Sequence, residues 1–220
     1  MKYEITGIKF INKTTGEVIY DGELPASIEI GLEDGKMRIV AIMGKSASGK
    51  DTLLRNLVRL NENRYHQIVS CTTRPIRDGE IDGSDYNFVT NQEMAQMIFD
   101  GSMLECSVFN NWGYGTCEED LSKEKINIGV FSPESIEILK DTGHDIFVVY
   151  CLCQDKDRII RTLEREDNPN IEEMIRRYEA DKKDFANTMM LADMFVHTDF
   201  ASSKELAKRV NDTIMCWAKE

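Results

Sequence analysis

One glycine-rich segment has the residue types that hold a phosphate chain. It reads Gly44-Lys45-Ser46-Ala47-Ser48-Gly49-Lys50, fits the spacing G-x-x-x-x-G-K, follows an apolar strand-like run and opens a helix. Glycines let backbone N–H groups curl around phosphate oxygens, and the helix N-terminus adds positive potential. We expect Lys50 to reach the β- and γ-phosphates of ATP. The residues predicted to bind ATP are Gly44, Ser46, Ala47, Ser48, Gly49, Lys50, Asp51 and Thr52.

The residue after Lys50 departs from this pattern. A Ser or Thr hydroxyl that binds Mg²⁺ is usual there, but the chain has Asp51 followed by Thr52. A carboxylate is a good hard ligand for Mg²⁺, so Asp51 could hold the metal directly or through water. It could equally serve only to cap the helix N-terminus. Both interpretations stay open on the sequence.

A second group of basic residues lies in a polar loop between Ser70 and Phe88. Arg74 and Arg77 are three residues apart, with Tyr86 shortly after them. Arginine forks suit bidentate phosphate binding, and a tyrosine hydroxyl can donate to a phosphate oxygen. Taken alone, the same residues are more typical of solvated surface charge than of a phosphate site.

The net charge of −12 excludes non-specific binding to a nucleic acid polymer, which such a chain repels. A nucleotide site must therefore be a local gathering of positive charge. The sequence has no apolar run long enough to span a bilayer and no recognisable signal peptide, so we expect a cytoplasmic protein. Its six cysteines show no zinc-ligand spacing and are expected to be free thiols.

Strands and helices alternate along most of the chain. Strand patterns are followed by helical ones, which favours an α/β fold with a mostly parallel, doubly wound sheet. Strands are expected at 3–11, 17–20, 27–32, 37–43, 68–71, 86–89, 125–131, 146–152 and 194–197. Helices are expected at 50–61, 91–100, 133–142, 156–166, 171–190 and from 203 onward. Residues 1–36 read as an N-terminal β-hairpin extension to a domain spanning 37–220.

The arginine loop resembles the GMP-binding segment of guanylate kinases. The shared pattern is S-x-T-T-R-x-x-R-x-G-E-x-x-G-x-D-Y-x-F, running from Ser70 to Phe88. Met103-Leu104-Glu105 is similar to the segment whose acidic residue reads guanine, and Tyr114-Gly115-Thr116 to the family's Tyr-Gly-Ser/Thr motif. The resemblance covers residues 37–215 in order. It implies a P-loop nucleoside monophosphate kinase with a nucleotide-binding region at about 68–118 and a helical lid at about 158–177.

The resemblance also implies roles for individual residues. Those expected to bind the acceptor nucleotide are Ser70, Arg74, Arg77, Glu80, Tyr86, Glu105, Tyr114 and Thr116. Those expected to act in phosphoryl transfer are Lys50, Arg74, Arg161, Arg165 and Arg177. Guanine offers N1–H and its 2-amino group as two parallel donors to a carboxylate, and adenine offers no such pair. Arg158 and Arg176, also in the lid region, read as surface charges.

Two segments depart from the family. Its Asp-x-Asp-like segment, which ends the third core strand, is replaced by 128–134, where both aspartates are missing. Asp51 could compensate for the lost metal-shell carboxylate. After the last strand, the family's Asn-Asp becomes His197-Thr198-Asp199, near the expected ATP base; His197 is expected to pack at the strand end.

The sequence therefore predicts ATP- and Mg²⁺-dependent phosphorylation of GMP or dGMP by a monomer or homodimer that binds neither nucleic acid nor membrane. One alternative keeps catalysis and changes the acceptor to another nucleoside monophosphate or a phosphosugar. Another is a binding module without activity, like the guanylate-kinase-like domains of scaffold proteins. Those tend to lose the lysine of the phosphate loop, which is present here as Lys50.

Overall fold

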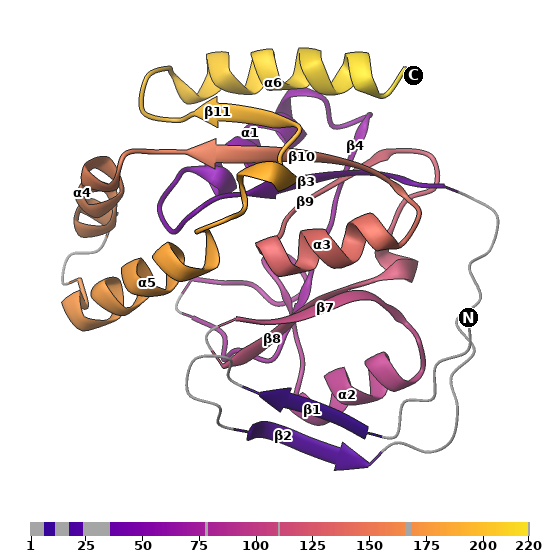
Figure 1. Ribbon diagram of the computed structural model, residues 1–220. Coiled ribbons are helices and arrows are strands. Elements are labelled where there is room, and N and C mark those ends of the chain that lie inside the picture. The colour runs from indigo at the N-terminus through magenta and orange to yellow at the C-terminus, as the bar shows by residue number, and fades with distance from the viewer. Residues whose placement is uncertain are drawn as a thin grey trace.

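A five-stranded parallel sheet forms the centre of the protein. The computed structural model in Figure 1 describes residues 7–11, 18–23, 36–77, 79–109, 111–165 and 169–219. The strand order is β11-β10-β3-β9-β4, and every neighbouring pair is parallel. The strands are β3 Arg38–Met43, β4 Tyr65–Gln67, β9 Ile126–Val130, β10 Asp145–Leu152 and β11 Met194–His197. The predicted mostly parallel α/β sheet is confirmed.

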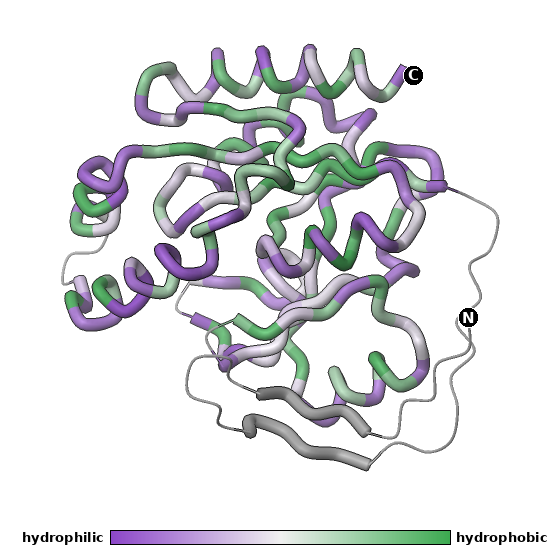
Figure 2. Tube along the Cα trace, viewed as in Figure 1, coloured by the Kyte–Doolittle hydropathy of each residue, from purple (hydrophilic) through white to green (hydrophobic). Residues whose placement is uncertain are grey.

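Helices cover both faces of this sheet. Helices α1 (Lys50–Leu60) and α6 (Ser203–Trp217) lie on one face, and α3 (Pro133–Asp141) lies on the other (Figure 1). Alternate residues of β3 enter the two cores: Val40 and Ile42 pack on the α1–α6 side, and Ile39 and Ala41 on the α3 side. Because successive strand residues point to opposite faces, a strand buried on both sides must be apolar throughout. Figure 2 shows the central strands as the most hydrophobic part of the fold.

A smaller sheet carries the segment that follows β4. Its order is β6-β5-β8-β7, with β5 Cys71–Thr72, β6 Asn87–Phe88, β7 Met103–Phe109 and β8 Trp112–Cys117. Helix α2 (Asn91–Phe99) begins at the predicted capping box, in which Thr90 and Glu93 bond to each other's backbone N–H. The antiparallel pair β7–β8 was missing from the sequence prediction.

Two lid helices follow β10: α4 (Asp155–Arg165) and α5 (Ile171–Asp184). Helix α5 was predicted to continue to about residue 190, and that was wrong. It ends at Asp184 because Phe185 turns toward the sheet, where its ring stacks on Tyr150 with centroids 5.7 Å apart. A single 3₁₀ turn, Met189–Leu191, then leads into β11.

The hairpin expected near the N-terminus is present in its described part. Strand β1 (Gly7–Ile11) pairs antiparallel with β2 (Val18–Glu23), which extends further than the strand expected at 17–20. The strand expected at 27–32, with its Asp-Gly turn, lies outside the described residues. Within the described ranges, no helix combines the length and apolar character needed to cross a bilayer.

Replacing Leu57 with Ala tests whether α1 anchors the sheet. Leu57 is fully buried between α1, the sheet and α6, so the truncation should lower the free energy of unfolding by about 2–5 kcal/mol. Urea denaturation measures this directly. Leu60→Ala on the same helix is the matched control, because Leu60 is 50% exposed and its truncation should change stability by less than about 0.5 kcal/mol. Equal losses in both variants would contradict the packing.

Candidate functional site

The phosphate loop connects β3 to α1 and has the backbone shape that a phosphate cradle requires. Ala47 and Gly49 have positive φ angles of 58° and 86°, and Gly49 is the residue before the helix. At Gly44 a Cβ atom would lie 2.5 Å from the Ser48 hydroxyl and 2.9 Å from the Cys151 carbonyl oxygen, so only glycine fits. Lys50 begins α1, with its side chain 20% exposed. The loop therefore presents N–H groups at a helix N-terminus beside a cation.

Residues at the end of β11 and on α4 fasten this loop. The Thr198 hydroxyl donates to the Ser48 carbonyl oxygen at 2.6 Å. Arg161, on α4, donates to the Thr198 carbonyl oxygen at 2.8 Å and to the Ala47 carbonyl oxygen at 3.4 Å. The predicted lid residue Arg161 thus lies at the phosphate loop. Thr198, one of the residues that replace the family's Asn-Asp, lies there with it.

A buried ion pair holds the loop from the other side. Asp181, on α5, accepts hydrogen bonds from the backbone N–H of Ser46 at 2.9 Å and from its hydroxyl at 3.2 Å. Arg158, on α4, pairs with Asp181 and donates to the Ser46 carbonyl oxygen at 2.8 Å. Arg158 is only 4% exposed, so its assignment as a surface charge was wrong. Sequence reasoning missed Asp181, because one aspartate in a charged helix gives no local signal.

The arginine loop forms a second cationic group, on the small sheet. Arg74 is 6% exposed and makes a two-pronged bond to Glu80, with both N···O distances at 2.9 Å. The Arg74 guanidinium also lies 5.4 Å from the centre of the Tyr86 ring, which in turn contacts the ring of Tyr114. Glu80 also accepts the backbone N–H of Arg77 at 2.8 Å. Glu80 therefore orients the two arginines, and the four predicted phosphate ligands do gather in one place.

Long-range electrostatic effects connect the two cationic groups. The pKa of Arg77 is lowered by partial desolvation of its guanidinium and then by the like charges of Arg74 and of Arg177 on α5. No hydrogen bond or ion pair among the described residues neutralises the Arg77 side chain. On the other side, the pKa of Tyr86 rises to about 12 through burial, with smaller contributions from Tyr114 and from Asp51 at the phosphate loop. The arginine loop therefore lies within electrostatic reach of both the lid and the phosphate loop.

The predicted base-reading carboxylate is buried beside these groups. Glu105, on β7, is 4% exposed, and one of its oxygens accepts the Thr116 hydroxyl at 2.9 Å. Its other oxygen, Oε2, has no hydrogen-bond partner within the described chain. Burial raises the pKa of Glu105 to about 7, against the opposing effect of the hydroxyls of Ser135 and Thr116. A buried carboxylate oxygen without a donor is costly and indicates a ligand that supplies one.

Hydroxyl groups, rather than carboxylates, follow β9. Phe131 is buried against Gly129, where a Cβ atom would lie 3.0 Å from the phenylalanine ring. The hydroxyl of Ser107 lies 3.2 Å from that of Ser132 and 2.9 Å from that of Ser135, at the start of α3. The missing aspartates noted in the sequence are thus replaced by apolar packing and a serine cluster.

The remaining predicted residues are placed as follows. Ser70 is half-buried just before β5, Thr52 is exposed on the first turn of α1, and Arg177 donates to Glu173 on its own helix at 2.8 Å. Arg165 ends α4, and its side chain lies outside the described part. Arg176 is 48% exposed and pairs with Glu173, as expected of a surface charge.

Asp51 is the carboxylate nearest to Lys50. Its side chain is 68% exposed and lies 3.6 Å from the Lys50 amine. It lies in the first turn of α1, where a carboxylate also favours the positive end of the helix, so the metal and capping roles both stay predictions. In the described ranges, no cluster of three or more His, Cys, Asp or Glu side chains could hold a metal ion. Asp51 could therefore bind a metal only together with ligands from a nucleotide or water.

His197 does not pack at the strand end as predicted. Its side chain is 57% exposed and lies beside the Phe200 ring, with centroids 5.6 Å apart. Asp199 lies 3.8 Å from His197 and accepts the Gln154 backbone N–H at 3.2 Å. The strand end is therefore polar, with an exposed His197 beside a buried Asp199 side chain, unlike the expected packing contact.

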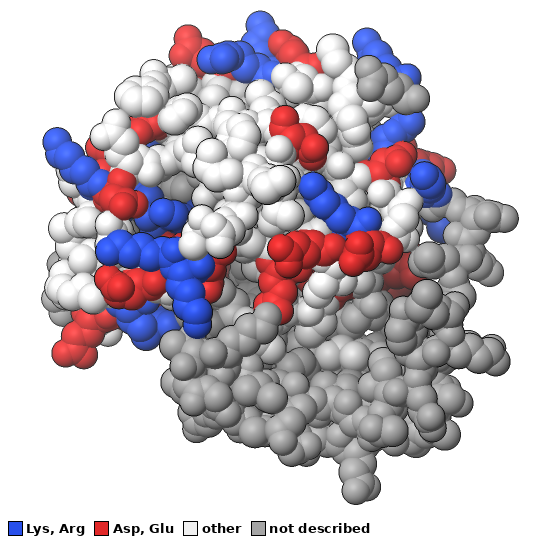
Figure 3. Space-filling model, in the orientation of Figure 1, with Lys and Arg blue, Asp and Glu red and all other residues white. Residues whose placement is uncertain are grey.

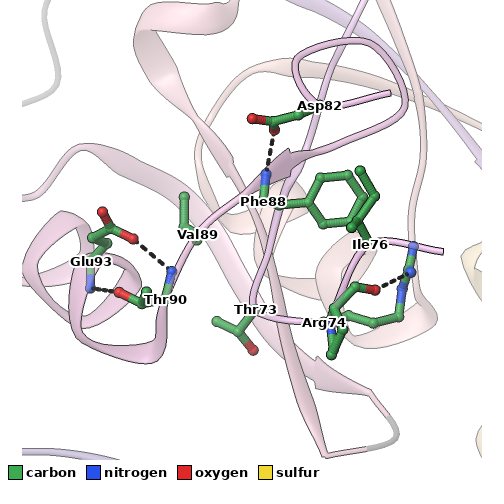
Figure 4. Close-up of a pocket in the computed structure, with 9 residues that line it drawn as sticks. Thr73, Arg74, Ile76, Asp82, Phe88, Val89, Thr90 and Glu93 are labelled. Atoms are coloured by element: carbon green, nitrogen blue, oxygen red, sulfur yellow. Dashed lines mark hydrogen bonds between the residues drawn. The ribbon is translucent and has the colours of Figure 1, made fainter. Parts of the chain in front are cut away.

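An open pocket of about 440 Å³ lies on the small sheet (Figure 4). Several of its polar side chains have structural partners: Asp82 accepts the Phe88 N–H, and Thr90 and Glu93 form the cap of α2. The guanidinium of Arg74, which also lines the pocket, bonds to the Pro75 carbonyl oxygen. These bonds hold the small sheet and α2 in place.

Basic and acidic side chains are intermixed on the visible face of the protein. In Figure 3, Lys and Arg side chains stand among Asp and Glu over α4 and α5. With a net charge of −12, the chain gathers positive charge only locally, as a nucleotide site in an acidic protein requires.

Comparison with known proteins agrees with this geometry. The guanylate kinase family model matches residues 36–211. The guanylate kinase of Frankia casuarinae is 30% identical over 172 residues, covering 76% of this chain and 92% of that protein. That of Wigglesworthia glossinidia brevipalpis is 27% identical over 176 residues, covering 77% and 84%.

A solved structure extends the comparison to the fold. The crystal structure of guanylate kinase from Anaplasma phagocytophilum superimposes with a TM-score of 0.60 at 16% identity, covering 82% of this chain and 86% of that one. At that identity the likeness concerns the fold alone. Together with the family match, which spans the phosphate loop, the arginine loop and the lid, it leads to one conclusion: the chain belongs to the guanylate kinase family.

Proposed function

We propose that the protein transfers the γ-phosphate of ATP to GMP, and to dGMP, forming the diphosphate. The observation that carries the proposal is the geometry of the arginine loop, where Glu80 binds the Arg74 guanidinium over the Tyr86 ring, which contacts Tyr114. Arg77, whose backbone N–H also binds Glu80, has a side chain with no hydrogen bond or ion pair among the described residues, and such a guanidinium suits an anion such as a nucleotide monophosphate. The phosphate loop with Lys50 supplies the site for the second phosphate chain.

Guanine is the base that best matches Glu105. Its N1–H and 2-amino group would donate to the two oxygens of the carboxylate, including the partnerless Oε2. Thr116 donates to the other oxygen and so orients the carboxylate. Adenine has an acceptor at N1 in place of the N1–H donor, so it would set a lone pair against the buried carboxylate, a penalty that discriminates strongly between bases.

Catalysis would rest on positioning and charge. The acceptor phosphate attacks the donor γ-phosphate directly, so no side-chain nucleophile is needed. Lys50, Arg74, Arg161, Arg165 and Arg177 would neutralise the charge that gathers between the two phosphates. A bound Mg²⁺ fits the site, since Mg²⁺ commonly takes one carboxylate together with substrate phosphates and water, and it would add further neutralisation. Asp51 is the residue that would hold it.

An assay of ADP formation tests the proposal against its alternatives. We expect GMP and dGMP to be phosphorylated in preference to AMP, dTMP and UMP at equal concentrations. The Lys50→Met variant serves as the control and should lose turnover while it stays folded. Turnover led by another monophosphate would support a changed acceptor, and no turnover with any of the five would support a binding module; either result would overturn the proposal.

GMP affinity should depend on pH through Glu105. Its pKa is raised to about 7, so the carboxylate is mostly protonated at pH 6 and mostly ionised at pH 8. Guanine needs the ionised form as acceptor, so GMP should bind about tenfold more tightly at pH 8 than at pH 6, since one pH unit below the pKa leaves a tenth of the groups ionised. Isothermal titration calorimetry measures the affinity.

Glu105→Gln separates this effect from titration of the GMP phosphate, which is the same in both proteins. The variant should bind GMP more weakly at pH 8 and should lose the part of the pH dependence that Glu105 contributes. If wild type and Glu105→Gln showed the same change in affinity between pH 6 and pH 8, the guanine-reading role would be wrong.

Asp51→Ala tests the metal role. The variant should need more Mg²⁺ for half-maximal turnover and have a lower maximal rate, because the exposed carboxylate that pairs with Lys50 is removed. GMP binding measured without ATP should not change. Asp212→Ala, which removes an exposed carboxylate from α6, is the matched control and should leave both quantities unaltered. Equal losses of turnover and GMP affinity in Asp51→Ala would contradict the role.

A further inference from the structure

Every polar group of Ser46 in the phosphate loop is bonded to the lid helices. Its N–H and hydroxyl donate to the two carboxylate oxygens of Asp181 on α5, at 2.9 and 3.2 Å. Its carbonyl oxygen accepts from the Nε of Arg158 on α4, at 2.8 Å. Helices α4 and α5 are thus both attached to one residue of the loop.

The attachment places a negative charge beside a loop whose shape suits phosphate. Asp181 is 1% exposed, and burial raises the pKa of its carboxyl group. The positive charges of Arg158 and, to a smaller extent, of Lys50 oppose that rise. Left alone, the carboxylate would repel the phosphates of ATP. Arg158 cancels its charge directly and is itself oriented by Asp155, which accepts from its Nη1 at 2.7 Å.

We propose that Arg158 and Asp181 are a positioning pair that sets ATP affinity. Asp181 fixes the peptide and hydroxyl of Ser46 in one orientation, and Arg158 both neutralises Asp181 and holds the adjoining carbonyl oxygen. The pair also ties the loop to α5, the helix whose Arg177 acts electrostatically on Arg77. Arg158 and Asp181 would act through Ser46 and not by touching a phosphate. The inference rests on the proposed function, because it takes the loop as the ATP site.

Two double variants separate positioning from simple stability. Arg158→Met alone leaves a buried, unpaired carboxylate, which strongly destabilises a fold, so the Asp181 carboxylate is removed in the same variant. A buried ion pair can be replaced by apolar residues of similar volume with little loss of stability, so Arg158→Met/Asp181→Leu should melt near the wild-type temperature. Without the bonds to Ser46, its ATP affinity should fall by about tenfold or more, the usual scale for losing a hydrogen bond to a charged group.

Arg158→Met/Asp181→Asn restores one acceptor. The asparagine oxygen can still accept the Ser46 N–H, and the neutral amide needs no arginine partner. This variant should bind ATP several-fold more tightly than the leucine variant at the same melting temperature. GMP affinity, measured separately by calorimetry, should equal that of wild type in both. Glu179→Gln, which breaks an exposed pair with Lys182 on the same helix, is the matched control and should change neither affinity.

The ATP affinities of the two double variants distinguish a positioning role from a purely structural one. If the leucine variant binds ATP as wild type does, or the asparagine variant binds it no better than the leucine variant, the pair is structural only and the inference is overturned. A wild-type protein that binds ATP but does not phosphorylate GMP would overturn the proposed function and leave this inference standing. A wild-type protein that binds no ATP would overturn both.

Discussion

The site depends on the phosphate loop keeping one backbone conformation. A loop with positive φ at Ala47 and Gly49 gains no stability from a ladder of backbone hydrogen bonds. Its peptide groups are held instead from outside, by Thr198 after the last strand and by Asp181 and Arg158 on the lid helices. Because these residues lie more than 100 positions along the chain, the loop is fixed only when the sheet and the lid are assembled.

The same constraint explains why buried charge is tolerated at the centre of the site. Asp181 and Arg158 are both nearly inaccessible, and an unpaired charge at either position would be expensive. Together they satisfy one another and the backbone of Ser46, so the cost of burial is offset by bonds that the loop itself requires. Glu105 differs, because one of its oxygens keeps no protein partner. The first arrangement organises the protein, and the second leaves a carboxylate oxygen that the proposed guanine would satisfy.

The sequence predicted correctly those local features that depend on residues close together in the chain. The phosphate loop follows from its glycine spacing and flanking elements, and the caps of α2, α3 and α6 from Thr90, Ser132 and Ser202. Contacts between residues far apart in the sequence have no such local pattern. Asp181 looks like any helix-surface aspartate, and Arg158 like a solvated lid charge, until the fold brings them together at Ser46.

The missed hairpin has a related cause. Strand β8 carries Gly113 and Gly115, which weaken a strand pattern, yet a Cβ atom at Gly115 would lie 2.7 Å from the Glu105 carbonyl oxygen. Glycine is needed there because β7 approaches closely, and that approach sets Thr116 opposite Glu105. The residues that lower the strand signal are therefore the ones that allow Thr116 to bond to Glu105. A sequence pattern built on side-chain propensity cannot register a contact made possible by a missing side chain.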